Sequence, residues 1–476
     1  MDFNHLAKLS RFKDIITTLL KYGLDEAVQR LNFPGAKLIK RIHPVKREIG
    51  IYERIRCVLE DLGPTFVKFG QIMSLRPDLL PSDLLFELSK LQDEVPPVEI
   101  SEIRTVVEKG LGQSIETVFS TFDNESIAAA SISQVHRAVL KKEGSIVVAK
   151  VQRPGIRKKI QADLDILESV ARRLHENSDD LKPYDLPNLV SVVRRNLIRE
   201  IDFRIEAKNL RIARTFGSET DVHIPEVYNE YCSEQMLVME YVQGKKIRDI
   251  DIGGEDAQGL AKQGLNAVIK QILEDGFFNA DPHPGNLLVT ADMQLCILDW
   301  GMVGHLTERD RYELIDLLKS VVDKDSDALV QVLLRLSKFA GGEIDNRALE
   351  RELLYILNTY YAVPIRDVNI GKLLLAIMTL LRNYHLQLPT DLVIMVKALV
   401  TAEGTARQVY PELDVVSEAK NYISRLAEQR FNPDNLWRSF QTNVSNIWTA
   451  QRDIPRQLLN ICSKLESGDL GLHFHL

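Results

Sequence analysis

The residues best suited to chemistry lie in one stretch, 279–301, in the second half of the chain. Asp281, Asn286 and Asp299 occur there with the spacing D-x-x-x-x-N followed by D-x-G. Two short apolar runs joined by residues 291–293 separate Asn286 from Asp299, so a hairpin would place these two side by side. An amide oxygen and a carboxylate form a hard oxygen site that suits Mg²⁺ when phosphate oxygens complete its shell. The spacing therefore indicates kinase-type phosphoryl transfer, with Asp281 as the catalytic aspartate and the other two as metal ligands.

A turn that only caps a strand could have the same Asp, Pro and Asn content. Motifs earlier in the chain are therefore needed to distinguish such a turn from a kinase-like site. Residues 146–150 read I-V-V-A-K, which is similar to the strand whose lysine, here Lys150, holds the α- and β-phosphates in kinases. Such a lysine needs an orienting glutamate on a nearby helix. The charged stretch 200–209 offers three carboxylates, Glu200, Asp202 and Glu206. The strand motif and the acidic stretch are each weak evidence alone, since charged residues on a helix usually just face solvent. Their occurrence in this order before the Asp281–Asp299 motif favours the kinase interpretation.

Two further segments are candidate nucleotide contacts. Residues 239–242 follow a predicted strand where an adenine-binding hinge is expected, which makes Glu240 and Val242 candidates. Where kinases carry a glycine-rich loop, this chain has an alanine-rich run, Ala128, Ala129, Ala130 and Ser131. Alanine approaches phosphate less closely than glycine and does not adopt positive φ cheaply. We therefore expect the nucleotide to sit differently and transfer to a protein hydroxyl to be handicapped.

Two residues near the motif, a histidine and a cysteine, could be reactive, but we expect each to have a structural role. His283 lies two residues after Asp281, and no second histidine is near in sequence, so we expect it to brace the loop rather than ligate a metal. Cys296 lies within the apolar run before Asp299 and is expected to pack in the core.

The elements that must position these residues can be read from periodicity and turn signals. Short helices are expected over 50–112 and long ones over 156–215. A hairpin is expected between 135–140 and 145–152, with strands at 224–231 and 236–241, a strand pair at 287–298, and only helices from about 306 onward. The predicted domains are an amphipathic, basic segment (1–48), a helical extension (49–114), a β-containing lobe with a long helical insertion (115–243), a helical lobe (244–420) and a helical tail (421–476).

The composition of the chain argues against several classes of protein. With 476 residues, 45% of them hydrophobic, the chain has material for more than one packed unit. Its net charge of −7 argues against a nucleic-acid binder. The four cysteines are far apart, which argues against a zinc ribbon or disulfide framework and suits a reducing compartment. We find no apolar run of the roughly 18–20 residues that a membrane span needs and no signal-peptide layout, so we expect a soluble, intracellular chain.

The N-terminal segment allows two interpretations. Residues 1–31 place apolar side chains at helical spacing, with lysines and an arginine on the opposite face, and a basic run follows at 37–47. The helix could dock on the protein core with a solvated basic face. It could instead lie in the interface of an anionic membrane.

Taken together, these motifs resemble the UbiB/AarF family of atypical protein-kinase-like ATPases linked to ubiquinone biosynthesis. The resemblance rests on Lys68–Gln71, which matches the family's K-x-G-Q, and on the following segment 89–97. It also rests on the alanine-rich loop with Gln134, Val135 and His136, and on the E-x-D pair Glu200 and Asp202.

The resemblance implies an α+β, protein-kinase-like bilobal fold with an N-terminal helical K-x-G-Q extension and a helical C-terminal tail. It implies that Lys68 and Gln71 face Glu200 and Asp202, that Lys150 pairs with Glu206, and that the extension covers the site of a protein substrate. The implied activity is Mg²⁺-dependent ATP hydrolysis, enhanced by anionic lipid and ubiquinone precursors. The implied partners are isoprenoid quinone precursors, the anionic membrane surface and quinone-biosynthesis proteins, at a cytoplasmic site peripherally associated with the membrane.

Two departures from the family pattern stand out. Ser133 occupies a position where many members carry Gly or Ala. The chain also stops at Leu476 where many bacterial members continue into a hydrophobic helix pair, so it would be a truncated soluble form or dock to membranes through residues 1–47. Two other functions stay open at this point: a small-molecule or protein kinase with an unknown acceptor, and a nucleotide-binding scaffold without turnover.

Overall fold

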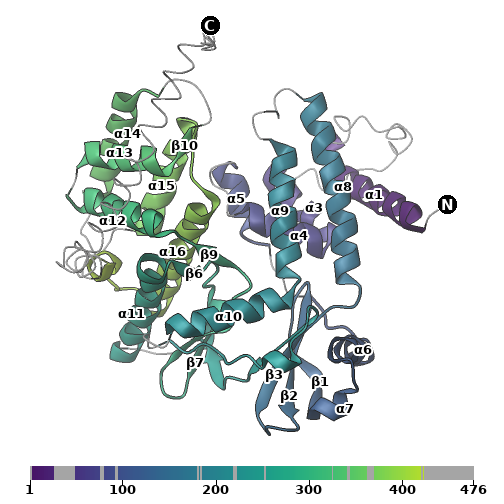
Figure 1. The fold of residues 1–476 in the computed structure, drawn as a ribbon. Coiled ribbons are helices and arrows are strands. Elements are labelled where there is room, and N and C mark those ends of the chain that lie inside the picture. The colour runs from purple at the N-terminus through teal and green to yellow at the C-terminus, as the bar shows by residue number, and fades with distance from the viewer. Residues whose placement is uncertain are drawn as a thin grey trace, which may run out of the picture. The chain divides into compact units, whose positions relative to one another are not determined.

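A computed structural model describes most of the chain, and Figure 1 shows its ribbon. The described residues are 3–25, 49–74, 80–91, 95–178, 182, 185–217, 222–250, 254–323, 325–339, 344–361, 369–419 and 422. The predicted basic run at 37–47 lies outside these residues, as does nearly all of the predicted tail at 421–476. Residues 1–416 form one compact unit by their internal contacts, and it is this unit that carries the site.

A four-stranded antiparallel sheet has the order β1 (Phe119–Ala129), β2 (Ser133–Leu140), β3 (Ile146–Gln152) and β4 (Met236–Glu240). The predicted hairpin between the second and third strands is confirmed. Along β3, Val147, Ala149 and Val151 are fully buried in the cluster beneath α6 (Ile100–Leu111) and α7 (Ile115–Val118). Lys150 therefore points to the opposite face, because side chains alternate along a strand.

Two parts of this sheet differ from the sequence prediction. The edge strand β1 was not foreseen, because its polar sequence, irregular burial and shifts in pairing register hide the two-residue period. The predicted strand at 224–231 is wrong. That segment makes only an isolated bridge from Val227 to Met239 and ends in a short 3₁₀ helix, η3 (Asn229–Tyr231). Pro225 has no N–H to give to a ladder, which explains why a strand does not continue there.

Helix α10 (Phe203–Gly217) packs against the other face of the sheet, and further helices form the extension and the pair that supports it (Figure 1). The long α8 (Ile156–Asn177) packs side by side with α9 (Leu186–Glu200), which precedes α10. The extension consists of α3 (Ile51–Leu62), α4 (Pro64–Met73) and α5 (Ser82–Leu88), which share a buried apolar cluster with α8 and α9. A Cβ on Gly70 would overlap the side chains of Leu91 and Leu59, so glycine is needed there for close packing.

The N-terminal helix α1 (Phe3–Lys21) docks on the extension. Its side chains Ile15, Ile16 and Leu20 are buried among residues of α3, α4 and α8. Arg11 forms a forked ion pair with Asp163 of α8, with N–O distances of 2.7 and 3.1 Å. For the described side chains of α1 the structure therefore favours the docked-helix interpretation, because Ile15, Ile16 and Leu20 pack against protein.

The second lobe begins with β5 (Gly244–Lys246) and the 3₁₀ turn η4 (Ile247–Asp249), followed by α11 (Gly254–Lys270) and a π-helical turn, η5 (Gln271–Asp275). Two small sheets follow, with the orders β5-β7-β8 and β6-β9. Their strands are β6 (Phe277–Asn279), β7 (Leu287–Thr290), β8 (Leu295–Ile297) and β9 (Val303–His305). The strand pair predicted at 287–298 is thus confirmed as β7 and β8.

The remainder is helical apart from one two-residue strand pair, β10 (Lys338–Phe339) and β11 (Leu386–Gln387). The helices are α12 (Glu308–Asp323), α13 (Ser326–Leu336), α14 (Asn346–Tyr361), α15 (Ile370–Asn383) and α16 (Thr390–Val409). Buried Glu403 of α16 accepts hydrogen bonds from the first N–H groups of α15, which fixes one helix against the other. Among the described helices, none has the length and apolar character to cross a membrane.

Replacing Asp163 tests how strongly α1 is fixed. The Asp163 side chain is fully buried and also accepts a 2.7 Å hydrogen bond from Thr65. Asp163→Ala would leave the partly buried Arg11 guanidinium without its carboxylate, which should lower the free energy of unfolding by about 3 kcal/mol. Urea unfolding followed by circular dichroism measures this loss. Arg172→Ala on the same helix breaks only an exposed pair and should cost less than about 0.5 kcal/mol; equal losses would contradict the account.

Candidate active site

The hairpin of β7 and β8 places the two predicted metal ligands together. Leu287 pairs with Ile297, and the Leu298 N–H donates to the Asn286 carbonyl oxygen at 3.0 Å. Asn286 and Asp299 therefore flank the open end of one hairpin, as the sequence predicts. The side-chain amide of Asn286 makes no hydrogen bond to any residue that the structure describes, whereas its backbone N–H donates to the His283 carbonyl oxygen.

An ionic cluster of three side chains occupies the centre of the site. Lys150 Nζ lies 2.8 and 2.9 Å from the two carboxylate oxygens of Glu206 on α10. The same nitrogen lies 3.2 Å from Asp299 Oδ2. The Lys150 and Glu206 side chains are 15% and 4% exposed, so water does little to stabilise their charges. The contact of Lys150 with Glu206 that the family resemblance implies is present.

Burial and neighbouring charges shift the pKa values of these three side chains in opposite directions. Burial alone would lower the pKa of Lys150, but Asp299 and Glu206 raise it above its usual value, so the ammonium stays charged. Burial raises the pKa of Glu206 to about 7, against the attraction of Lys150. Burial would also raise the pKa of Asp299, yet Lys150 and the Gly301 N–H hold it below its usual value. Asp299 is thus the carboxylate kept ionised and available to a cation.

Backbone contacts fix the helix and the hairpin relative to each other. The Asn209 amide of α10 donates to the Trp300 carbonyl oxygen at 2.9 Å, in a fully buried contact. Gly301 lies close to both acids: a Cβ there would be 3.1 Å from Asp299 Oδ1 and 3.9 Å from Glu206 Oε2. Any side chain at Gly301 would therefore crowd Asp299.

The loop of Asp281 is held by residues that the sequence analysis did not single out. Buried Asn279 accepts a hydrogen bond from the Asp281 N–H at 2.8 Å and donates to the Asp299 carbonyl oxygen at 2.7 Å. Asn279 thereby connects the two acidic segments. The Asp281 carboxylate itself pairs with Lys397 of α16, with Nζ 2.8 Å from Oδ1. Lys397 lies 116 residues further along the chain, so no local pattern could have identified it.

The alanine-rich run forms the tight turn between β1 and β2. The Ala130 N–H donates to the Ser133 carbonyl oxygen at 2.8 Å, and Ser131 and Ser133 are buried. Arg153 connects this turn to the extension, because its guanidinium donates to the carbonyl oxygens of Ala130 and Pro96 at 2.8 and 2.6 Å. Ala128 and Ala129 end β1. Unlike a free glycine-rich loop, this turn is held by the buried Ser131 and Ser133 and by Arg153, although Ala128 is exposed.

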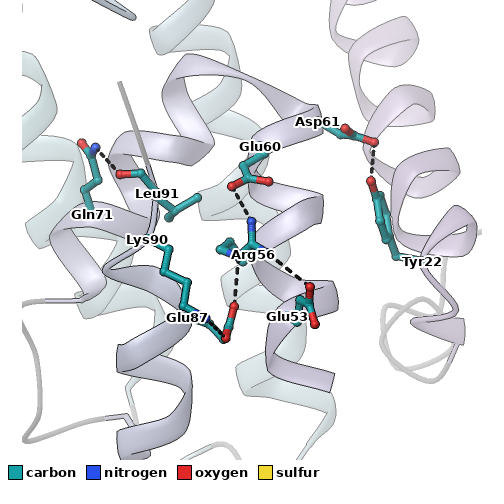
Figure 2. A network of polar contacts seen from close by, with 9 residues as sticks. All are labelled: Tyr22, Glu53, Arg56, Glu60, Asp61, Gln71, Glu87, Lys90 and Leu91. Atoms are coloured by element: carbon teal, nitrogen blue, oxygen red, sulfur yellow. Dashed lines mark hydrogen bonds and ion pairs between the residues drawn. The ribbon is translucent and has the colours of Figure 1, made fainter. Parts of the chain in front are cut away.

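Lys68 of the K-x-G-Q segment contacts the E-x-D pair. Lys68 Nζ lies 2.6 Å from Glu200 Oε1, and both side chains are mostly buried. Gln71 instead donates to the Leu91 carbonyl oxygen at 3.1 Å, as Figure 2 shows. Asp202 pairs with Arg204, which lowers the pKa of Asp202. The expectation that Lys68 and Gln71 both face Glu200 and Asp202 therefore holds for one ion pair, while Gln71 and Asp202 have other partners.

A surface network holds the extension's own helices together (Figure 2). Arg56 of α3 lies within 3.5 Å of three carboxylates, Glu53, Glu60 and Glu87. The last of these is on α5 and is shared with Lys90. Because one arginine serves several acids, ordering its side chain costs less entropy per contact than separate pairs would.

The predicted hinge residues lie at the end of β4. The Glu240 carboxylate accepts hydrogen bonds from the Glu226 N–H and lies 3.1 Å from His223 Nε2, so its side chain is used within the protein. Val242 follows two residues later and is partly buried. His283 accepts a hydrogen bond from the Gly285 N–H at 3.1 Å, which braces the loop as expected. Cys296 is fully buried, and burial raises its thiol pKa to about 12, which fits core packing.

The donor set fits Mg²⁺ with a phosphate substrate. Among the described residues, no group of three or more His, Cys, Asp or Glu side chains could hold a metal. Asn286 and the ionised Asp299 would supply two oxygen ligands, and the remaining positions would fall to phosphate and water oxygens. Lys150, Glu206, Asp281, Asn286 and Asp299 are the residue types, in the order along the chain, that a protein-kinase-like phosphotransferase uses.

Comparison with known proteins gives the family. Residues 90–333 match the ABC1 atypical kinase-like domain, and residues 353–414 match the UbiB helical domain. A protein of Cellvibrio japonicus named "Probable protein kinase UbiB" is 33% identical over 474 residues, covering 97% of this chain and 85% of the relative. A protein of Aeromonas hydrophila with the same name is 33% identical, covering 91% and 82%. The chain belongs to the ABC1/UbiB family of atypical kinase-like proteins.

A solved structure supports the fold. The structure titled "The complex structure of Rv3197-erythromycin from Mycobacterium tuberculosis" has a TM-score of 0.52 and 22% sequence identity to this chain. The similarity covers 76% of this chain and 93% of that one. Together with the family match, it confirms the predicted kinase-like α+β fold with a helical C-terminal region.

A double-mutant cycle tests the contact between the extension and the E-x-D segment. Lys68→Met and Glu200→Gln should each destabilise the protein, because each leaves a mostly buried polar partner without its counter-charge. The double variant should recover part of the loss, with a coupling free energy of about 1–2 kcal/mol in urea unfolding. Lys90→Met, which breaks an exposed pair, is the control. Additivity within about 0.3 kcal/mol would contradict a direct interaction between Lys68 and Glu200.

Proposed function

We propose that this protein is a Mg²⁺-dependent ATPase that supports ubiquinone biosynthesis by coupling ATP hydrolysis to the handling of lipid precursors at a membrane surface. The observation that carries the proposal is the cluster of Lys150, Glu206 and Asp299 beside an Asn286 amide without a partner among the described residues. This arrangement suits a nucleotide triphosphate and a divalent cation. The biosynthetic role rests on family membership.

Each residue of the site has a role in the proposed hydrolysis. Lys150, oriented by Glu206, opposes negative charge on the phosphates. Asn286 and Asp299 would hold Mg²⁺, which supplies positive charge to the phosphate oxygens when bound. Asp281 positions a water molecule whose oxygen bonds to the γ-phosphorus as the bond from that phosphorus to the β–γ bridging oxygen breaks. Asp281 accepts a proton from this water, and the products are ADP and inorganic phosphate.

Two features favour water over a protein hydroxyl as acceptor. In the alanine-rich turn Ser131 and Ser133 are buried and the Ala130 carbonyl oxygen accepts a hydrogen bond from Arg153, so the turn has less freedom than a glycine-rich loop that adapts over phosphates. The extension is anchored to α9 through Lys68 and Glu200. If it covers the acceptor side, as the family resemblance implies, a substrate protein would have little access to the γ-phosphate.

Phosphate release from MgATP tests the proposal. The wild type should release phosphate faster with anionic-lipid vesicles than without them. Asp299→Asn should lower the rate at least ~100-fold, because it removes a charged ligand and a partner of Lys150. Asp292→Asn is the matched control, since Asp292 is exposed in the turn of the same hairpin.

The other outcomes distinguish the alternatives. Label transfer from the γ-position to an acceptor, beyond free phosphate, would identify a kinase instead. Nucleotide binding without turnover, with or without lipid, would contradict the ATPase and leave a nucleotide-binding scaffold.

A further inference from the structure

Lys397 reaches the site from a helix that lies outside the kinase-like domain. It is on α16, within the region 353–414 that matches the UbiB helical domain. Its Nζ lies 2.8 Å from Asp281 Oδ1. The side chains of Lys397 and Asp281 are 26% and 41% exposed, so the pair is open to solvent rather than sealed in the core. A ligand could therefore approach both groups.

The backbone around Lys397 is firmly placed. Its neighbours Met395, Val396 and Ala398 are buried. Further along α16, Ala402 and Ala406 line a small apolar cavity together with Pro282, the residue after Asp281. Glu403 connects the same helix to α15. Lys397 is thus presented by a packed helix against the catalytic loop, as a positioned group should be.

The ion pair of Lys397 and Asp281 is not well explained by its contribution to the stability of the fold. A pair with both members partly exposed contributes little to folding. A cation beside the carboxylate that faces the attacking group has a clearer use, because phosphoryl-transfer sites place positive charge against the terminal phosphate. Lys150 already pairs with Glu206 and Asp299, and in the proposed site it would hold the phosphates nearer the nucleoside, as the matching lysine of kinases does. Lys397 is placed at the opposite, acceptor end, beside Asp281.

We propose that Lys397 is a phosphate-binding residue of this site, which holds Asp281 in place and presents its ammonium group to the terminal phosphate of ATP. The inference rests on the proposed function, since it requires an ATP site. During hydrolysis Lys397 keeps its protons and stabilises charge on the γ-phosphoryl oxygens, while Asp281 accepts the proton from water and ADP leaves with the bridging oxygen. The helical domain would then complete the active site rather than only pack against it.

Comparing the affinities for a nucleoside triphosphate and a nucleoside diphosphate tests whether Lys397 binds the terminal phosphate. Isothermal titration calorimetry would measure binding of a non-hydrolysable ATP analogue and of ADP, each with Mg²⁺, to the full chain. Lys397→Gln should weaken binding of the ATP analogue about tenfold or more, as expected for losing a charge-assisted hydrogen bond, and change ADP binding less than about twofold. Lys397→Arg should keep most of the preference for the triphosphate, because it keeps the charge.

Controls separate this role from a structural one. Lys372→Gln changes an exposed lysine on the neighbouring α15 and should alter neither affinity. Thermal melting checks that the variants fold, and Lys397→Met, which keeps much of the aliphatic stem, is the second test if the Gln variant melts early.

The outcomes are distinct from those for the proposed function. A wild type that binds both nucleotides, with no loss or equal losses in the Lys397 variants, overturns the role of Lys397 and leaves the ATP site intact. A wild type that binds neither nucleotide overturns the proposed function and this inference with it.

Discussion

The ionic contact among Lys150, Glu206 and Asp299 is the constraint on which the rest of the site depends. A buried lysine and a buried glutamate are costly unless they are paired, and here each is stabilised by the other. Lys150 comes from the sheet, Glu206 from α10, and Asp299 from the hairpin of the second lobe. The charges are paired only when these three elements are assembled, so folding itself brings together the groups that we propose bind phosphate.

The surrounding structure limits what this site can do. In a kinase the loop above the phosphates is mobile and the acceptor side is open. Here Ser131 and Ser133 of the alanine-rich turn are buried, and Arg153 connects the turn to the segment that leads out of the extension. The extension is itself anchored through Lys68 and Glu200 and packed on α8 and α9. On the other side, Lys397 of α16 occupies the position beside Asp281. These contacts are the physical basis for proposing a specialised ATP site.

The local parts of the site were predictable from sequence, and the long-range parts were not. Asn286 and Asp299 are joined by a short hairpin, so their spacing alone predicted their proximity. Lys150 ends a recognisable strand sequence. By contrast, the contacts of Lys397 with Asp281 and of Asn279 with the Asp299 carbonyl oxygen depend on how separate segments pack, and neither residue carries a motif. Gln71 shows the limit of resemblance, because its amide donates to the Leu91 carbonyl rather than to the E-x-D carboxylates. The edge strand β1 was missed since its bulges break the alternation on which strand prediction relies.

Magnesium dependence of ATP binding tests the central claim most directly. ATP affinity of the full chain would be measured over a series of Mg²⁺ concentrations, with the Asn286→Ala variant alongside. The account predicts that the affinity of the wild type rises with Mg²⁺ and that this rise is largely lost when the Asn286 amide is removed. Affinity that does not depend on Mg²⁺, or an equal rise in both proteins, would contradict the assignment of these oxygens as the metal site.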